Sequence, residues 1–165
     1  MNLNEQITSI IKTSKCFFNM LTASPQANGF YQAGRVKGLI PYLYRVYELK
    51  LLKNLKSNKI KVNEYKKGEW TFHAKGLWLF ENNEEKPSLT ILGSSNFSNR
   101  SYHKDTEIQF YLYSLCPKMK EKLFKENSRI LSESQEVSED ELKLDNDVRI
   151  KLRHKILYYF MNKFL

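Results

Sequence analysis

Hydrophobic side chains recur at helical spacing in three stretches of the chain. Residues 38–54 carry leucines and a valine three or four positions apart, which is the repeat of one face of an α-helix. Pro41 suits the first turn of this helix, where a missing backbone N–H leaves no bond unmade. Residues 1–15 show a weaker form of the same pattern, and residues 117–131 begin with a proline. The spacings therefore predict helices in all three stretches.

Short apolar runs and alternating patterns lie between these helices. Runs of this kind, bounded by glycine, proline and polar clusters, are typical of β-strands. The expected strands are residues 16–22, 60–65, 70–80, 89–92 and 106–115. Because helices and strands are interspersed along the chain, the expected class is an α/β layered domain.

The composition changes sharply after residue 131. Residues 132–146 are acidic with a single lysine, which predicts a solvated or disordered linker. Residues 147–165 are basic and aromatic and are expected to form an amphipathic helix. That helix could lie in the interface of an anionic membrane, or it could pack on the domain. The expected organisation is a domain over residues 1–131, a linker over 132–146 and a C-terminal helix over 147–165.

The charge balance favours anionic partners. The formal net charge is +9, and the 165 residues include ten phenylalanines and ten tyrosines, enough aromatic surface for a core. Candidate partners of such a chain are nucleic acid, phospholipid headgroups and phosphorylated small molecules. Charge alone does not choose among them, and a biased amino-acid composition would give the same surplus.

The cysteines and apolar runs give limited information about the compartment. Cys16 and Cys116 have no metal or redox spacing and stand in apolar runs, so we expect buried free thiols in a reducing compartment. No segment approaches the roughly 20 apolar residues that cross a bilayer. Residues 1–15 resemble neither a secretory signal nor a mitochondrial presequence.

The candidate chemistry is concentrated in residues 70–107. His73 and Lys75 stand two apart in an expected strand, so both side chains would project from one face. A histidine can attack or protonate a phosphate ester while a neighbouring ammonium neutralises its oxygens. A Gly-Ser-Ser-Asn turn then offers hydroxyl and amide donors for phosphate oxygens, and a downstream glutamate could orient an imidazole. The candidate catalytic residues are His73, Lys75, Ser94, Asn96 and Glu107.

The pattern H-x-K, then G-S-x-N, then a downstream acid resembles the HKD motif of the phospholipase D superfamily. One position departs from that motif, because the family's aspartate, five residues after the lysine, is Phe80 here. The resemblance implies a phospholipase D-like layered α-β-α domain with a central mixed sheet, of which this chain would hold one HKD half.

A narrower resemblance accounts for the missing aspartate. The phosphatidylglycerophosphate synthases of eukaryotes have a second motif that runs like TFHAKGLW and also lacks it. They continue into a GS-x-NF segment and an RS-x-H-x-D-x-E segment, and residues 71–78, 93–97 and 100–107 look like these three pieces. Residues 21–31 and 38–41 also look like that subfamily. The resemblance covers roughly residues 17–115.

The resemblance implies phosphatidyl transfer from CDP-diacylglycerol to glycerol 3-phosphate with release of CMP. The family route passes through a phosphohistidine and requires no metal and no other cofactor. In two-motif relatives the first motif usually supplies the nucleophile, so the resemblance favours the general acid/base role for His73 and leaves the nucleophile as the alternative. The resemblance also implies a peripheral place on the mitochondrial inner membrane. Substrate-binding candidates, for which turn formation or surface charge is the alternative role, are Asn28, Tyr31, Arg100, His103 and Asp105.

The chain holds only one HKD motif, whereas the family reaction needs two that face each other. His103 is followed by Asp105 and His154 by Ile156, so neither begins a second H-x-K. The chain could be one part of a longer or split enzyme, it could pair with a copy of itself, or it could keep the fold without turnover. Three functions therefore stay open: a phosphatidyltransferase completed by another HKD half, a homodimeric phosphodiesterase or nuclease, and a structural subunit. The missing aspartate and the synthase-like loop at Asn28 make nucleic acid the less favoured partner.

Overall fold

Two three-stranded sheets organise the part of the chain that the structure describes. The computed structural model describes all residues except 1–2, 4, 35–36, 56–58, 82–83 and 145–165. One sheet has the strand order β1-β2-β6 and the other the order β3-β4-β5. The α/β class is therefore confirmed. The strands are divided between two sheets where one central mixed sheet was expected, and of the two, β1-β2-β6 is the mixed one.

The mixed sheet is built around a parallel pair. Strand β1 (Phe18–Ala23) pairs in parallel with β2 (Ile60–Tyr65), with Phe18 opposite Ile60 and Ala23 opposite Tyr65. A parallel pair needs a crossover connection, and α2 (Ile40–Leu55), preceded by the short 3-10 helix η1 (Lys37–Leu39), supplies it. Strand β6 (Ser134–Glu136) then adds to β2 in antiparallel direction.

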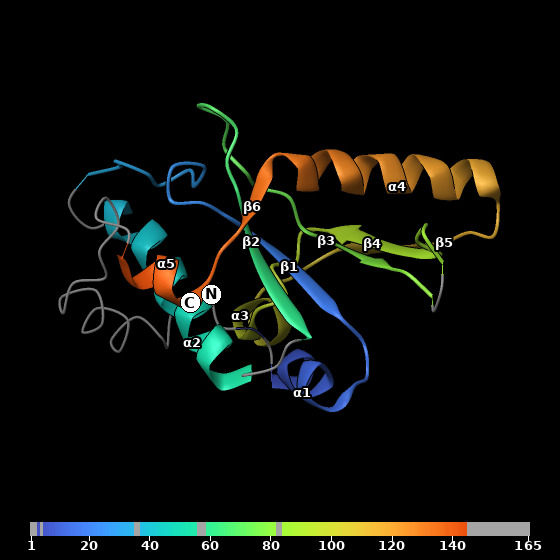
Figure 1. Cartoon of the computed structure of the whole chain (residues 1–165), viewed down its shortest axis with the longest axis horizontal. Coiled ribbons are helices and arrows are strands. Elements are labelled where there is room, and N and C mark those ends of the chain that lie inside the picture. Colours follow the sequence, from blue (N-terminus) through green and yellow to red (C-terminus); the bar gives the residue numbers. More distant parts are fainter. Residues whose placement is uncertain (1–2, 4, 35–36, 56–58, 82–83, 145–165) are drawn as a thin grey trace.

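The hydrophobic core lies between this sheet and two helices. Helix α5 (Glu139–Leu144) packs beside α2 on one side of the sheet (Figure 1). Leu43 of α2, Val62 of β2 and Leu142 of α5 are almost completely buried. Burying a leucine or valine side chain stabilises a fold by about 1.5–3 kcal/mol. This region therefore satisfies its own apolar surface.

The second sheet is an antiparallel meander. Strand β3 (Gly76–Leu79) pairs with β4 (Leu89–Gly93), and β4 pairs with β5 (Gln109–Tyr113) at the sheet edge. The five-residue helix α3 (Asn99–His103) connects β4 to β5. Helix α4 (Pro117–Ser132) runs alongside this sheet (Figure 1).

Ion pairs and a bridge tie the outer helices to this region. Lys86 pairs with Glu121 at 2.6 Å and Glu84 with Lys120 at 2.8 Å, which joins the β3–β4 connection to α4. Helix α1 (Glu5–Thr13) precedes β1, and Leu3 forms an isolated β-bridge with Ser98 beside α3. The helices predicted from spacing are thus confirmed as α1, α2 and α4.

The strand expected over residues 70–80 is shorter than predicted. Its first half leaves the ladder because the backbone turns there: Gly68 has a φ of +49°, and the Trp70 N–H donates to the Lys67 carbonyl at 2.9 Å. The Phe72 N–H donates to the carbonyl of Ala27, in a loop, at 2.8 Å instead of pairing with a strand. Regular pairing begins only at Gly76. Alternation alone does not distinguish a strand from an extended segment bonded to a loop.

The acidic segment after residue 131 is ordered as far as it is described. It contains β6 and α5, so residues 134–144 are not disordered, although several of their side chains are exposed to solvent as expected. Its carboxylates pair with lysines distant in sequence: Glu133 with Lys67 at 2.8 Å and Glu136 with Lys61 at 2.7 Å. The helix expected over residues 147–165 lies outside the described residues.

Both cysteine predictions were wrong. Cys16 and Cys116 are exposed free thiols rather than buried ones. Cys16 precedes β1 and Cys116 precedes α4, so each stands in a connection at the end of an element and not in an apolar run of the core. No helix among the described residues has the length and apolar character that a membrane crossing requires.

Candidate active site

The segment that carries His73 is fixed by its neighbour Phe72. The Phe72 ring stacks on Tyr65, the last residue of β2, with ring centroids 4.6 Å apart. Its N–H bonds the Ala27 carbonyl in the loop after β1. These two contacts hold residues 71–75 against the carboxyl ends of β1 and β2. The segment is thus anchored through both the backbone N–H and the ring of Phe72, and the neighbouring His73 is exposed.

Lys75 lies beside His73, although neither is part of a strand. The Lys75 ammonium donates to the His73 carbonyl oxygen at 3.2 Å. The prediction that both project from one strand is wrong in its structural premise, because β3 begins at Gly76. The two residues are nevertheless brought together. Lys75 is half-buried, whereas the His73 side chain is open to solvent and to a substrate.

Ser94 and Glu107 are joined directly. The Ser94 hydroxyl donates to the Glu107 carboxylate and accepts from the Ile108 N–H at 3.0 Å. The Ser94 N–H also donates to the Ile108 carbonyl at 3.0 Å. Glu107 therefore bonds a serine hydroxyl, whereas an imidazole was the expected partner.

Gly93 explains why this contact is possible. A Cβ at position 93 would lie 2.2 Å from the Ile108 carbonyl oxygen and 2.9 Å from the Gln109 Cα. Real Cβ atoms do not approach backbone so closely, so only glycine lets the end of β4 reach the start of β5. The glycine of the Gly-Ser-x-Asn motif thus sets the position of the serine that follows it.

The charge of Glu107 also acts on Lys75. Burial lowers the pKa of the Lys75 ammonium, and the negative charge of Glu107 opposes that shift. Such an effect requires the carboxylate to be near the lysine. Glu107 therefore links Ser94 and Lys75 into one group, which we call the Lys75–Ser94–Glu107 cluster. A partly desolvated cation and a hydroxyl that share one carboxylate neighbour are suited to holding a phosphate group.

Asn96 stands in a tightly bonded turn. Its N–H donates to the Ser101 hydroxyl at 3.2 Å, and Phe97 adopts a left-handed φ of +56°. The Ser95 hydroxyl accepts from the Phe97 N–H at 3.1 Å, and the Ser98 hydroxyl caps α3 by accepting from the Ser101 N–H. The Asn96 side chain is exposed, so its amide is available to a ligand.

The predicted substrate-binding residues fall into two groups. Arg100 and Asp105 hold each other, with the arginine Nε 3.0 and 3.1 Å from the two carboxylate oxygens. The ring of His103 contacts the ring of Tyr102 edge-on at 4.9 Å. All lie on α3 or in the turn after it. Their role in binding a substrate stays a prediction.

Asn28 and Tyr31 shape the loop after β1. The Asn28 side-chain oxygen accepts from the Phe30 N–H at 3.0 Å, and the Asn28 carbonyl accepts from the Tyr31 N–H at 2.9 Å. Asn28 therefore forms the turn that was the alternative to a binding role. Because Ala27 in the same loop bonds Phe72, this turn lies against the segment that carries His73.

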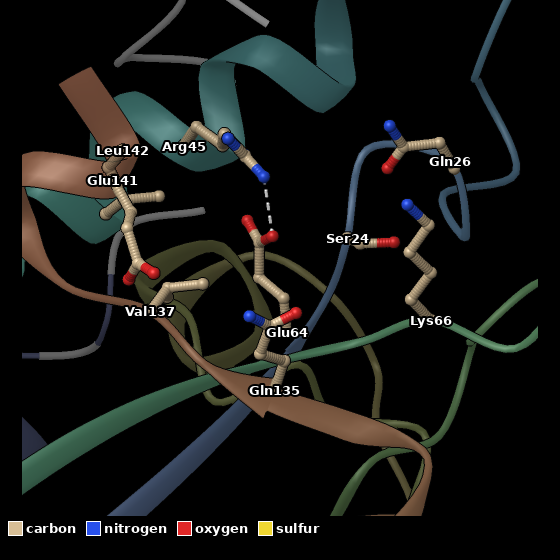
Figure 2. Close-up of a pocket in the computed structure, with 9 residues that line it drawn as sticks. All are labelled: Ser24, Gln26, Arg45, Glu64, Lys66, Gln135, Val137, Glu141 and Leu142. Carbon is tan, nitrogen blue, oxygen red and sulfur yellow. Dashed lines mark hydrogen bonds and ion pairs between the residues drawn. The ribbon is translucent and has the colours of Figure 1, made fainter. Parts of the chain in front are cut away.

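Sequence reasoning missed a polar pocket beside this loop. Figure 2 shows it lined on one side by Ser24, Gln26 and Lys66, and crossed by the bond between Arg45 and Glu64. Its remaining walls are Gln135, Val137, Glu141 and Leu142. A signal for it in the sequence was Arg45, the one charged residue among positions 40–47 of the helix. The described residues contain no group of three or more His, Cys, Asp or Glu side chains that could hold a metal ion.

Comparisons with known proteins support the resemblance seen in the sequence. No family model matches the chain. A probable CDP-diacylglycerol–glycerol-3-phosphate 3-phosphatidyltransferase of Dictyostelium discoideum is 33% identical over 99% of this chain and 28% of its own length. The human enzyme of that name, described as mitochondrial, is 33% identical over 83% of the chain and 25% of its own length. The Saccharomyces pastorianus enzyme is 29% identical over 98% of the chain and 34% of its own length.

A solved structure shows the fold. The phosphatidylserine synthase of Haemophilus influenzae superposes on 99% of this chain with a TM-score of 0.75 and 19% identity, and the match covers 37% of that chain. The protein thus spans about a third or less of the curated relatives it matches. It has the fold of part of a phosphatidylserine synthase and a sequence similar to part of the glycerol-phosphate phosphatidyltransferases.

Proposed function

We propose that this chain supplies one HKD half of a phospholipase D-type phosphatidyltransferase that makes phosphatidylglycerophosphate from CDP-diacylglycerol and glycerol 3-phosphate. The observation that carries the proposal is the Lys75–Ser94–Glu107 cluster beside the exposed His73. The relatives that the chain matches are named for this reaction.

The proposed reaction proceeds in two displacements. A histidine nitrogen attacks the phosphorus of CDP-diacylglycerol, the bond to the CMP oxygen breaks, and a phosphatidyl–histidine bond forms. A hydroxyl of glycerol 3-phosphate then attacks that phosphorus and the P–N bond breaks. One imidazole is the nucleophile, while a second protonates the leaving CMP and later takes the proton of the attacking hydroxyl. Atoms and charge balance without an oxidant, a reductant or a metal.

The residues of this chain would act on the phosphate and on protons. His73 is assigned the acid/base role, with its imidazole open to the substrate. The Lys75 ammonium and the amide of Asn96 would neutralise and bond the nonbridging oxygens, where charge accumulates as the bond to the nucleophile forms. Glu107 would fix the Ser94 hydroxyl in place through the bond between them.

The second histidine must come from outside this motif, and one surface is suited to bind its carrier. The pairing register places Leu77 with Tyr111 and Leu79 with Tyr113 on the same face of the β3-β4-β5 sheet. These four side chains are 41% to 68% exposed, and Phe110 on the opposite face is 66% exposed. A contiguous apolar surface of this kind is rare on a monomer and marks an interaction site. We propose that it receives the other HKD half, from a second copy or from another chain.

The proposed location is a mitochondrial membrane surface. The vertebrate relatives are named as mitochondrial enzymes. One proposed substrate is a lipid, so the protein must reach a bilayer, and the net charge of +9 favours an anionic one. Peripheral binding to the inner membrane is the form that we propose.

CMP release from CDP-diacylglycerol in mixed micelles tests this function, with glycerol 3-phosphate added and single-stranded DNA as the competing substrate. We expect CMP release that needs glycerol 3-phosphate and that His73→Ala abolishes. Lys122→Ala, an exposed lysine on α4, is the matched surface control and should leave the rate unchanged. DNA hydrolysis with no CMP release would favour the nuclease. Absence of both, with the other half of the site supplied, would favour a structural subunit.

A further inference from the structure

Strand β5 has an open edge that begins beside the candidate active site. Within the described part of the chain it pairs with β4 alone. We infer that this edge receives an added β-strand from the part of the longer relatives that this chain does not cover. Strand addition goes beyond the proposed function, because it can be measured whatever reaction the completed protein catalyses.

The hydrogen bonds to β4 fix which backbone groups of β5 face the open edge. The Ser94 N–H donates to the Ile108 carbonyl, and the Ser114 N–H donates to the Ser88 carbonyl, both at 3.0 Å. In an antiparallel pair, residues whose backbone groups point toward the partner strand alternate with residues whose groups point away from it. The residues of β5 whose N–H and C=O groups point to the open edge are therefore Gln109, Tyr111 and Tyr113.

Strand β5 lacks the features that usually protect a sheet edge from pairing. Short length, charged side chains and proline are common protections. Strand β6, at the edge of the other sheet, has three residues, and its Glu136 pairs with Lys61. Residues 108–115, by contrast, contain no charged residue and no proline. An edge of this kind is a template for a further strand.

The side chains of β5 are apolar on both faces of the sheet. Phe110 on one face is 66% exposed, and Tyr111 on the other is 68% exposed. A strand that is buried on both faces reads as a continuous apolar run, and residues 110–113 are such a run. Strand β5 therefore has the composition of a strand inside a sheet, although the described residues leave it at an edge.

The open backbone groups favour a strand over a lipid bilayer as the occupant. An apolar patch can insert into lipid, but N–H and C=O groups that enter the hydrocarbon without partners are strongly unfavourable. Tyr111 presents both an exposed ring and outward backbone groups. An added strand satisfies both, because it bonds the backbone and its side chains pack beside the rings.

The length of the relatives indicates where the strand comes from. The match spans 99% of this chain but only 28% of the Dictyostelium discoideum relative and 37% of the Haemophilus influenzae synthase. Most of each protein thus lies outside the matched part and can provide a strand. A second copy is the less suitable source, because it carries the same net charge of +9 toward this one.

The open edge also lies close to the Lys75–Ser94–Glu107 cluster. Gln109 is two residues after Glu107, and Ile108 between them bonds Ser94. Adjacent strands lie about 4.8 Å apart, so a strand paired at Gln109 would border the cluster. Strand addition would therefore hold the rest of the enzyme next to the candidate catalytic residues.

Amide exchange, measured residue by residue by NMR, tests the pairing in the wild-type chain. The full chain is co-expressed with the part of the Dictyostelium discoideum relative that it does not cover, and the complex is compared with the chain alone. We expect the Tyr111 and Tyr113 amides to exchange at least about tenfold more slowly in the complex. The Leu112 amide points toward β4 and is the internal control, which should be protected in both samples.

Two substitutions of Tyr111 separate backbone pairing from side-chain packing. Tyr111→Ala and Tyr111→Pro both remove the ring, but only the proline also removes the outward N–H. Proline is tolerated where the N–H of an edge strand faces solvent, so both variants of the chain alone should fold. We expect Tyr111→Pro to bind the complementary part about tenfold or more weakly than Tyr111→Ala, because a ladder hydrogen bond is lost.

Three results would overturn the assignment. Tyr111 and Tyr113 amides that stay unprotected in the complex, with equal binding by the two variants, would mean that the partner packs on a sheet face. Protection that rises with the concentration of this chain alone would make a second copy the occupant. A folded complementary part that does not bind the wild-type chain would also contradict strand addition. CMP release enters none of these readouts, so strand addition and the transferase can fail independently.

Discussion

The two sheets of this protein differ in how they satisfy their apolar surface. The β1-β2-β6 sheet buries Leu43, Val62 and Leu142 against α2 and α5 within the chain itself. The β3-β4-β5 sheet leaves Phe110 and Tyr111 about two-thirds exposed on opposite faces of its edge strand. The first region makes a complete core, whereas the second presents an apolar surface that none of the described residues covers.

The candidate catalytic residues lie mainly at the second sheet and not at the first. Lys75, Ser94 and Glu107 stand at the ends of strands of the second sheet, where backbone geometry is demanding, as at Gly93 and Phe97. The first sheet contributes the platform, because Tyr65 and Ala27 hold the segment of His73. Stability is thus concentrated in one region and reactivity in the other, and the apolar face beside the reactive region is where a further subunit would complete the site.

A matched pair of leucine truncations should separate the two regions most strongly. Leu43→Ala removes a fully buried side chain of the first core and should cost about 2–5 kcal/mol of the free energy of unfolding. Leu77→Ala removes a side chain that is 41% exposed on the second sheet and should cost about 1 kcal/mol or less. Urea denaturation at low protein concentration measures both. Equal costs would mean that the second sheet is a core in its own right.

Lys75 should matter for the reaction and not for the fold. Lys75→Ala should lower the rate of CMP release about 10²–10³-fold, the usual cost of one group that stabilises charge in the transition state. Because the pKa of Lys75 is lowered, its ammonium is lost at a lower pH than that of an ordinary lysine, and the rate should fall as the pH rises through that value. Lys75→Arg should keep its activity to higher pH. An alkaline limb that is the same in wild type and Lys75→Arg would contradict this role.

The absence of a side chain at Gly93 should be required to hold Ser94 next to Glu107. Gly93→Ala places a Cβ against the Ile108 carbonyl, so the end of β4 must shift, at a cost of about 1–3 kcal/mol in unfolding free energy. The shift also moves Ser94 away from Glu107, so CMP release should fall as well. Gly29→Ala is the control, because nothing lies within 4 Å of the added methyl group. If Gly93→Ala is as harmless as Gly29→Ala in both assays, the close approach does not position the cluster.

Glu48, on helix α2 beside the first sheet, should make the free energy of unfolding depend on pH. The pKa of Glu48 is raised in the folded state, so the folded protein holds a proton that the unfolded chain releases. Its unfolding free energy should therefore fall as pH rises from the unfolded pKa toward the folded one, by at most about 1.4 kcal/mol per pH unit. Glu48→Gln should remove this slope. Denaturation curves at pH 5 and pH 8 measure it, and an unchanged slope in the variant would show that Glu48 is not the group responsible.

Local signals predicted the helices and the motif well. The helical repeat and Pro41 placed α2, and Pro117 placed the start of α4, because these depend on neighbouring residues. The motif also identified Ser94 and Glu107, which the structure joins by a hydrogen bond.

Long-range pairing was not accessible from the sequence. The acidic segment was expected to be a solvated or disordered linker, but it forms β6 and α5, and its carboxylates pair with Lys61 and Lys67 on and beside β2. The extended segment before Gly76 was expected to be part of a strand, but it bonds a loop. The pocket was missed for the same reason, because Ser24 and Lys66 become neighbours only when β1 and β2 pair.

The dependence of CMP release on chain concentration tests whether the active site is completed from outside this chain. The wild-type chain would be assayed alone over a wide concentration range, and again with the complementary part of a relative that this chain does not cover. We expect activity per chain to rise with concentration if a second copy supplies the other histidine, or to appear on adding the complementary part if another chain does. In both cases it depends on His73. A rate per chain that is constant with concentration and unaffected by the added part would contradict the claim that the site is completed from outside this chain, as would the absence of CMP release in every mixture of folded proteins.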